Sequence, residues 1–120
     1  MPPQSPPIRF KGILIAEDEP GLCMVMESVL SAAGYRVAVA HDGDAALSMA
    51  ISDPDLQLII TDVRLPRKNG MQVLQEIMKS APERTVIVMS AYGSIEMAVE
   101  ALQTGAYHFL PKPFGKDVLL

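Results

Sequence analysis

The sequence predicts an α/β domain in which helices cover both faces of a parallel β-sheet. Four short apolar runs alternate with longer segments whose apolar residues recur at helical spacing. Three of the runs are rich in Ile, Leu and Val, which is typical of strands that are buried on both faces of a sheet. Parallel strands need crossover connections, and right-handed helical crossovers would cover both faces. With a fifth, half-polar strand, we expect a (βα)₅ arrangement.

The first strand is expected at residues 13–16, and a helix should follow it because five apolar residues recur at positions i, i+3, i+4, i+7 and i+8. We expect these five to face the sheet: Leu22, Val25, Met26, Val29 and Leu30. Gly34 would end this helix, since glycine readily adopts the conformation of a helix C-terminus. The second strand, residues 35–40, has a polar face and so suggests an edge or half-covered position. Asp42 is expected to cap the second helix.

The second half of the chain continues the pattern. A third strand at residues 57–61 leads through a loop to a helix whose inward residues are Val73, Leu74, Ile77 and Met78. A fourth strand at residues 85–89 precedes a helix that Ser94 would cap and whose inward residues are expected to be Ile95, Ala98, Val99 and Leu102. Gly105 should end that helix, and residues 107–110 form the fifth strand. A last helix would begin near Phe114 and be cut short at Leu120, so we expect it to fray.

Length and composition restrict the class of protein. We expect a disordered, proline-rich leader at residues 1–10 and one folded domain at residues 11–120, taken from a longer chain. The net charge of −4 and the absence of a basic cluster argue against direct nucleic-acid binding. No apolar run is long enough to cross a membrane, and no signal peptide is present, so we expect a soluble, cytoplasmic protein. The single cysteine, Cys23, is expected to be a core residue.

Polar residues stand where the predicted strands end. Glu17 and Asp18 follow the first strand, Asp62 the third, Ser90 the fourth and Lys112 the fifth. The carboxyl ends of parallel strands meet at one edge of the sheet, where open α/β sheets bind ligands. Three carboxylates at this edge repel one another unless a cation or protons intervene. Their oxygens favour Mg²⁺ or Mn²⁺ over zinc or copper, since no thiolate is present and neither histidine is expected at a strand end.

The remaining groups at this edge suit a phosphoryl group. Lys112 would supply a positive charge and Ser90 a hydroxyl donor to its oxygens. Asp62 is then the best-placed nucleophile, because carboxylates can form aspartyl phosphates. Taken singly, each of these residues is an ordinary loop or surface residue. Their joint placement on different strand ends is what points to phosphoryl transfer.

Four sequence blocks resemble the receiver domain of bacterial two-component response regulators over residues 11–120. The blocks are ILIAEDEP from Ile13, DVRLPRKNG from Asp62, SAYG from Ser90, and GAYHFLPKPF from Gly105. The resemblance implies a flavodoxin-like doubly wound fold with strand order 2-1-3-4-5. It also implies roles: Asp62 as phosphoacceptor; Glu17, Asp18, Asp62 and the main-chain carbonyl of Arg64 as metal ligands; Ser90 and Ala91 as phosphate-binding and switch positions; Phe109 as the switch aromatic residue; and Lys112 as the phosphate-contacting lysine.

Two positions differ from the commonest family pattern. Glu17 stands where Asp is more usual, and its extra methylene suits either a direct or a water-bridged metal contact. Phe109 lacks the hydroxyl that Tyr would bring, so burying its ring would leave no phenol to satisfy. The same resemblance implies a cis peptide bond between Lys112 and Pro113.

The favoured function is therefore a phosphorylation switch. The resemblance implies that Asp62 takes a phosphoryl group from a sensor histidine kinase, and that the face of the fourth helix, fifth strand and fifth helix then repacks. This would control an output domain beyond Leu120, with homodimerisation as one consequence. Residues 90–102 resemble receivers of sigma-54-dependent transcription activators, which implies a transcriptional output.

Two other functions fit the sequence less well. A metal-dependent phosphatase or hydrolase would need a second acidic residue two positions after Asp62, a histidine base or a cap insertion, and the sequence has none of these. A phosphate-independent interaction module would normally have lost part of the acidic and phosphate-binding set, and none of it is missing here.

Overall fold

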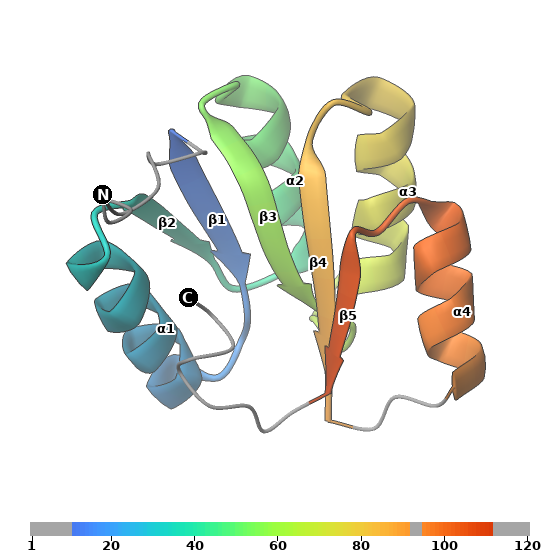
Figure 1. Cartoon of the computed structure of the whole chain (residues 1–120), viewed down its shortest axis with the longest axis horizontal. Helices are drawn as coiled ribbons and strands as arrows, with labels where there is room; N and C mark the ends of the chain where they lie inside the picture. Colours follow the sequence, from blue (N-terminus) through green and yellow to red (C-terminus); the bar gives the residue numbers. More distant parts are fainter. Residues whose placement is uncertain (1–10, 92–94, 112–120) are drawn as a thin grey trace, which may run out of the picture.

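The structure is a computed structural model that describes residues 11–91 and 95–111. In this part of the chain, parallel strands form one five-stranded sheet in the order β2-β1-β3-β4-β5 (Figure 1). The elements are β1 (Gly12–Ala16), α1 (Pro20–Ala32), β2 (Arg36–Ala40), α2 (Gly43–Ser52), β3 (Leu56–Asp62), α3 (Gly70–Ser80), β4 (Thr85–Ser90), α4 (Ile95–Thr104) and β5 (His108–Pro111). The predicted fold class and strand order are confirmed.

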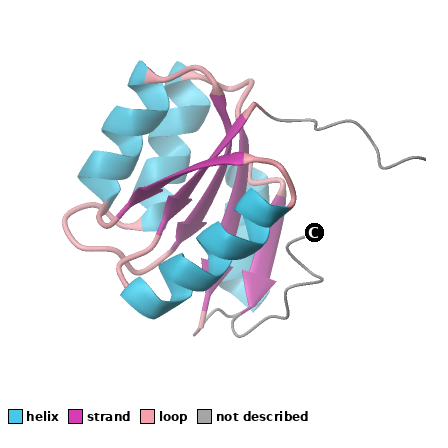
Figure 2. Cartoon of the chain, turned by 90° about the vertical axis from the view of Figure 1, so that its left-hand side faces the viewer, coloured by secondary structure: helices cyan, strands magenta, loops and turns pink. Residues whose placement is uncertain are grey.

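Among the described helices, α1 covers one face of the sheet and α2, α3 and α4 cover the other (Figure 2). Alternation along β1 divides its side chains between the two layers: Ile13 and Ile15 pack with α1, whereas Leu14 and Ala16 pack with the opposite helices. The central strands are thus apolar on both sides. This is why they read as continuous apolar runs in the sequence.

Local sequence signals set the ends of the helices. The Asp42 side chain accepts a hydrogen bond from the backbone N–H of Ala45 and caps α2, as predicted. Asn69 and Gln72 form a reciprocal capping box at the start of α3. Gly34 and Gly105, which follow α1 and α4, have φ values of 100° and 122°. Both predicted glycine stops are confirmed, because this left-handed region favours glycine.

The predicted inward faces of two helices are partly wrong. In α1 the buried residues are Cys23, Met26 and Leu30, while Val25 is 56% exposed. The difference is larger in α4. Of the residues expected to face inward, Ile95, Val99 and Leu102 are exposed and Ala98 is half-buried, whereas Ala101 is fully buried. The helix meets the core through this small alanine, which lets it lie close to the sheet and turns its larger apolar side chains outward.

Strand β2 lies at one edge of the described sheet, as its polar face predicted. Cys23 is a buried residue, also as predicted. Within the described residues, no helix combines the length and the apolar character that a membrane span requires. The predicted leader at residues 1–10, the Ser94 cap and the short last helix lie outside the described residues.

Candidate functional site

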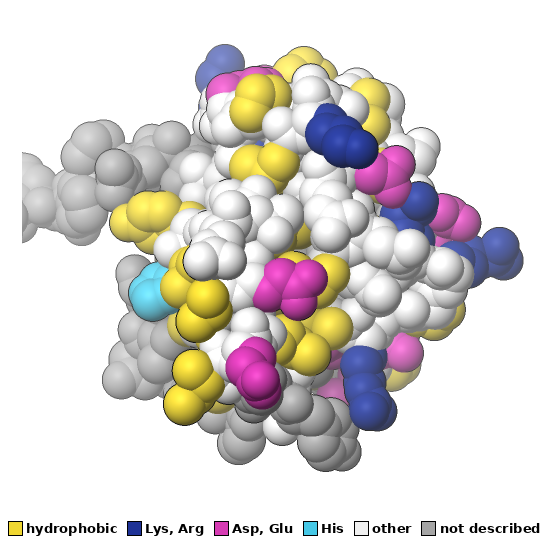
Figure 3. All heavy atoms as spheres, turned by 90° about the vertical axis from the view of Figure 1, so that its right-hand side faces the viewer, with side chains coloured by type: hydrophobic (Ala, Val, Ile, Leu, Met, Phe, Trp, Pro, Cys, Tyr) yellow, Lys and Arg dark blue, Asp and Glu magenta, His cyan; other side chains and the backbone are white. Residues whose placement is uncertain are grey.

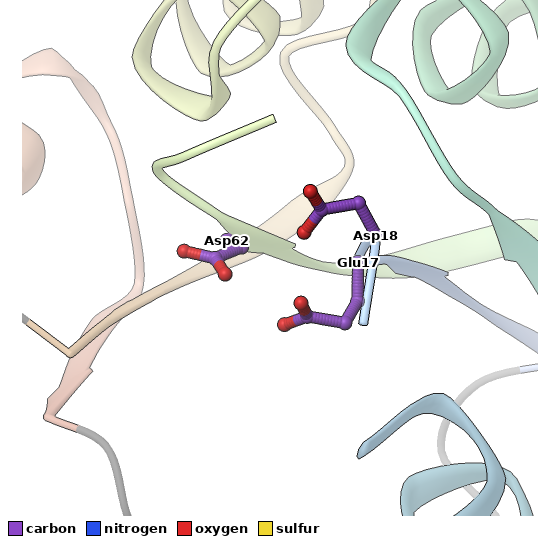
Figure 4. A group of neighbouring side chains, drawn as sticks. All are labelled: Glu17, Asp18 and Asp62. Carbon is purple, nitrogen blue, oxygen red and sulfur yellow. The ribbon is translucent and has the colours of Figure 1, made fainter. Parts of the chain in front are cut away.

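The three predicted carboxylates lie together at the carboxyl edge of the sheet (Figure 4). Strands β1 and β3 are neighbours, and Ala16 is paired with Thr61, so the next residues along each strand, Glu17 and Asp62, lie side by side. One carboxylate oxygen from each of Glu17, Asp18 and Asp62 lies within 4.8 Å of the others. Glu17 and Asp62 are buried, and Asp18 is exposed. The cluster is therefore set into the protein on one side and open to solvent on the other.

Backbone N–H groups orient two of these carboxylates. The N–H of Glu19 donates to Glu17 Oε2 at 3.1 Å, and the N–H of Arg64 donates to Asp62 Oδ1 at 3.1 Å. These bonds hold the side chains in place, yet they do not remove the repulsion among three negative groups at this separation. A hard divalent cation such as Mg²⁺ or Mn²⁺ fits this set of oxygen donors, with room for water on the side of Asp18. In chemical terms, the cluster is suited to hold such an ion.

The loop that follows Asp62 carries Arg64 and turns back sharply into α3. The N–H of Gly70 donates to the carbonyl oxygen of Val63 at 2.9 Å. A Cβ on Gly70 would lie 2.9 Å from the carbonyl carbon of Asp62, so glycine is needed for this close return. The backbone of Arg64 is thereby kept beside the carboxylate cluster.

Strand β4 brings Ser90 to the same edge. Its neighbour Met89 is paired with Asp62 across the sheet, and the N–H of Val63 donates to the carbonyl oxygen of Met89 at 3.0 Å. Ser90 is buried at the end of β4, and Ala91 after it is exposed. Phe109 lies in β5, is half-buried, and packs against the core between the sheet and helices α2, α3 and α4. Lys112 and Pro113, and the cis peptide bond expected between them, lie outside the described residues.

Comparison with known proteins identifies the family. A family model described as "Response regulator receiver domain" matches residues 13–120. The chain belongs to the response regulator receiver domain family.

The receiver is similar to the transcriptional regulatory protein GlrR of Escherichia coli K12, with 38% identity over 107 residues. That match covers 89% of this chain and 24% of GlrR, so the chain spans about a quarter of the length of this relative.

Two solved structures are also similar to this receiver. One is a crystal structure of a response regulator protein from Burkholderia pseudomallei with a phosphorylated aspartic acid, calcium ion and citrate. It has a TM-score of 0.83 and 28% identity, and the match covers 91% of this chain and 64% of that one. The other is a solution structure of the beryllofluoride-activated NtrC4 receiver domain dimer, with a TM-score of 0.85 and 29% identity, covering 91% and 89% of the two chains.

Two residues at the receiver's acidic site were not predicted from the sequence. The thiol of Cys23 donates to the backbone oxygen of Glu17, and Nδ1 of His41 lies 3.2 Å from the same oxygen. Burial, together with the nearby charge of Glu17, raises the pKa of Cys23 and keeps it a neutral thiol. The expectation that no histidine lies at a strand end was wrong, because His41 directly follows the last residue of β2. Its place immediately after an apolar strand was the signal that could have found it.

Proposed function

We propose that this receiver is a phosphorylation switch in which Asp62 accepts a phosphoryl group from a phosphohistidine of a sensor histidine kinase. The observation that carries this proposal is the position of the Asp62 carboxylate beside those of Glu17 and Asp18 at the edge of the sheet. The phosphorylated aspartic acid of the Burkholderia relative supports it. On this proposal the domain assists its own phosphorylation and dephosphorylation, and turns over no separate substrate.

The transfer needs a nucleophile and charge neutralisation. A carboxylate oxygen of Asp62 attacks the phosphorus, a P–O bond forms, and the P–N bond to the donor imidazole breaks with its electron pair leaving on nitrogen. Glu17, Asp18, Asp62 and the main-chain carbonyl of Arg64 would hold Mg²⁺ or Mn²⁺, which would neutralise the carboxylates and the phosphoryl oxygens. Ser90 and Ala91 at the end of β4, with Lys112, would bind the other phosphoryl oxygens.

The response to phosphorylation would pass from this edge to the output surface. Ser90 would move toward the phosphoryl group, and Phe109 would follow it, which would repack the face that includes α4 and β5. An output domain beyond Leu120 would read that face, with a transcriptional and sigma-54-dependent role and with dimerisation of the phosphorylated form. GlrR, a transcriptional regulatory protein, supports the transcriptional role, and the dimer of the beryllofluoride-activated NtrC4 receiver domain supports dimerisation.

Phosphorylation by a small donor tests the proposal directly. We expect acetyl phosphate to add one phosphoryl group to the wild-type receiver in the presence of Mg²⁺, and to add none after treatment with EDTA, because the clustered carboxylates repel an approaching anion. Intact mass spectrometry measures both results. Labelling that survives complete removal of metal would contradict the metal-assisted mechanism.

A matched pair of variants locates the acceptor. Asp62→Asn should abolish labelling, whereas Asp55→Asn, just before the other end of the same strand, should leave it unchanged. A labelled Asp62→Asn protein would assign the nucleophile to another residue.

A further inference from the structure

The loop that carries Arg64 runs directly over the first turn of α2. Gly43, the first residue of α2, is buried, and its N–H donates to the carbonyl oxygen of Pro66 at 3.2 Å. A Cβ on Gly43 would lie 2.5 Å from the carbonyl carbon of Lys68 and 2.7 Å from Lys68 Cβ, and would overlap the Lys68 carbonyl oxygen. Two of these three atoms belong to the backbone and cannot move aside by a side-chain rotation. Only a residue without a side chain allows this contact.

Residue 43 must be glycine because a side chain has no space there, and not because the backbone conformation requires it. Among the described glycines, positive φ values occur at Gly34 and Gly105 and not at Gly43. Another residue could therefore adopt the backbone conformation of Gly43, but its side chain would push the loop away from α2. Gly43 therefore allows the loop at Pro66 and Lys68 to lie directly against the start of α2.

The same contact determines where the backbone of Arg64 lies. Arg64 stands between Val63, whose carbonyl oxygen is held by the N–H of Gly70, and Pro66, whose carbonyl oxygen is held by the N–H groups of Gly43 and Lys68. Arg64 also donates its own N–H to Asp62 Oδ1. A shift of the loop at Pro66 and Lys68 would thus reach both the Arg64 carbonyl and the orientation of the Asp62 carboxylate.

A charged contact joins the same two segments from outside. Arg67 Nε lies 3.6 Å from Asp42 Oδ2, and Asp42 is the N-cap of α2. Arg67 has a φ of 71°, which is a conformation that non-glycine residues rarely adopt. Tertiary contacts of the loop must compensate for this strain, and the ion pair of Arg67 with Asp42 at the start of α2 is one of them.

We propose that Gly43 is a positioning residue for the metal site, which sets the loop of residues 63–69 so that Arg64 and Asp62 can act together on the cation. This inference rests on the proposed function, because it assigns to α2 a role in the binding of Mg²⁺ or Mn²⁺. Gly43 touches neither the cation nor the phosphoryl group. It acts through Pro66 and Lys68.

Two alanine variants separate this role from a general effect on folding. In Gly43→Ala, the new methyl group meets Lys68; in Gly21→Ala, the methyl group is added near the start of α1 and meets no atom within 4 Å. Free Mn²⁺ is measured by electron paramagnetic resonance during titration of each protein with Mn²⁺ alone. We expect the dissociation constant of Gly43→Ala to rise by about tenfold or more, as is typical when a group that orients a metal ligand is lost. Gly21→Ala should match the wild type, and far-UV circular dichroism should be the same for all three proteins.

A second measurement on the wild type covers the case in which Gly43→Ala does not fold. Coupling between sites is reciprocal: if the Gly43 contact favours metal binding, metal binding must favour the contact. We therefore expect Mg²⁺ to slow hydrogen exchange of the Gly43 amide more than that of the Asp53 amide, which closes the other end of the same helix by donating to Met49.

The outcomes distinguish the two proposals. Equal Mn²⁺ affinity of a folded Gly43→Ala and Gly21→Ala, or equal Mg²⁺ effects on the Gly43 and Asp53 amides, would overturn the positioning role and leave the switch intact. A wild-type receiver that binds no Mn²⁺ and is not labelled at Asp62 would overturn the proposed function, and the positioning role with it.

Discussion

Asp62 ends a strand in which five of the six preceding residues are buried, and its own side chain is also buried. A carboxylate in this place loses hydration, and two further carboxylates lie close to it. The backbone N–H of Arg64 compensates in part by donating to Oδ1. The site is therefore under electrostatic stress when no cation is bound, which is the condition under which cation binding becomes most favourable.

Asp62→Asn should stabilise the metal-free receiver. The amide removes one of three like charges, while its oxygen can still accept from Arg64, so we expect a gain on the order of 1 kcal/mol in the free energy of unfolding in EDTA. Saturating Mg²⁺ should reverse the order, because a ligand stabilises only the protein that binds it. Urea unfolding of both proteins, with and without Mg²⁺, measures the two signs. A less stable Asp62→Asn in EDTA would show that hydrogen bonding at Asp62 outweighs the repulsion.

The apolar face of α4 that the sequence pattern placed in the core is exposed. Ile95, Val99 and Leu102 are exposed on this helix, and Figure 3 shows hydrophobic and acidic side chains side by side over this face of the molecule. The face coincides with part of the surface that the proposed switch would repack. Exposed apolar side chains there are consistent with a surface that another part of the protein covers in one of its states.

Two substitutions in α4 test which face is in the core. Ala101→Leu should destabilise the receiver by about 1–3 kcal/mol, because a fully buried alanine leaves no room for three more carbon atoms. Leu102→Ala, one position along, should change the free energy of unfolding by less than about 0.5 kcal/mol, as is usual for surface positions. Denaturant unfolding measures both. A large cost for Leu102→Ala together with a small one for Ala101→Leu would restore the orientation that periodicity alone predicted.

Features that depend on a few neighbouring residues could be predicted from the sequence. The strands, the Asp42 cap and the stops at Gly34 and Gly105 each depend on a few neighbouring residues, and each was found. The orientation of α4 was not, because apolar residues occur on more than one side of this helix and only the packing decides which side is buried. A small residue such as Ala101 carries little hydrophobic signal, even where it makes the closest contact.

The same distinction applies to the site. Glu17, Asp18 and Asp62 were predicted to meet because the strand ends can be read along the chain and the carboxyl ends of parallel strands share one edge of a sheet. Cys23 lies beside Glu17 through the path of α1, which no short motif encodes, whereas the place of His41 directly after β2 was a local signal that was overlooked. The closeness of Gly43 to Lys68 is likewise a contact between distant segments, and a glycine before a helix resembles an ordinary turn in the sequence.

At the scale of the whole molecule, the two edges of the sheet have opposite electrostatic roles. The carboxyl edge gathers the like charges of Glu17, Asp18 and Asp62. The amino edge carries opposite charges in pairs: Arg36 Nη2 lies 3.0 Å from Asp53 Oδ2, and Lys11 Nζ lies 4.0 Å from Asp55 Oδ1. There the buried guanidinium of Arg84 also donates to the backbone oxygens of Ala50 and Leu56, at the end of α2 and the start of β3. Attractive contacts at the amino edge thus help to stabilise a fold in which repulsion among carboxylates destabilises the carboxyl edge.

The contribution of the Arg36–Asp53 pair at the amino edge should depend on pH. The hydrogen bond from Arg36 lowers the pKa of Asp53 below its ordinary value of 3.8, with a smaller contribution from the N–H of Asp55. Because the folded-state pKa is the lower one, the ion pair stabilises the fold above pH 3.8, and this contribution is lost as the pH falls through the folded-state pKa. Arg36→Gln should therefore lower the melting temperature at neutral pH, and the difference from the wild type should shrink below pH 3.8.

Salt and a second variant complete this test. Both side chains of the Arg36–Asp53 pair are exposed to solvent, so added salt should reduce the difference at neutral pH. Lys11→Gln breaks the longer and more exposed pair with Asp55, and it should change the melting temperature less than Arg36→Gln does. A difference for Arg36→Gln that persists unchanged at pH 2 would show that Arg36 stabilises the fold by packing its side chain on the edge strand β2, and not by its charge.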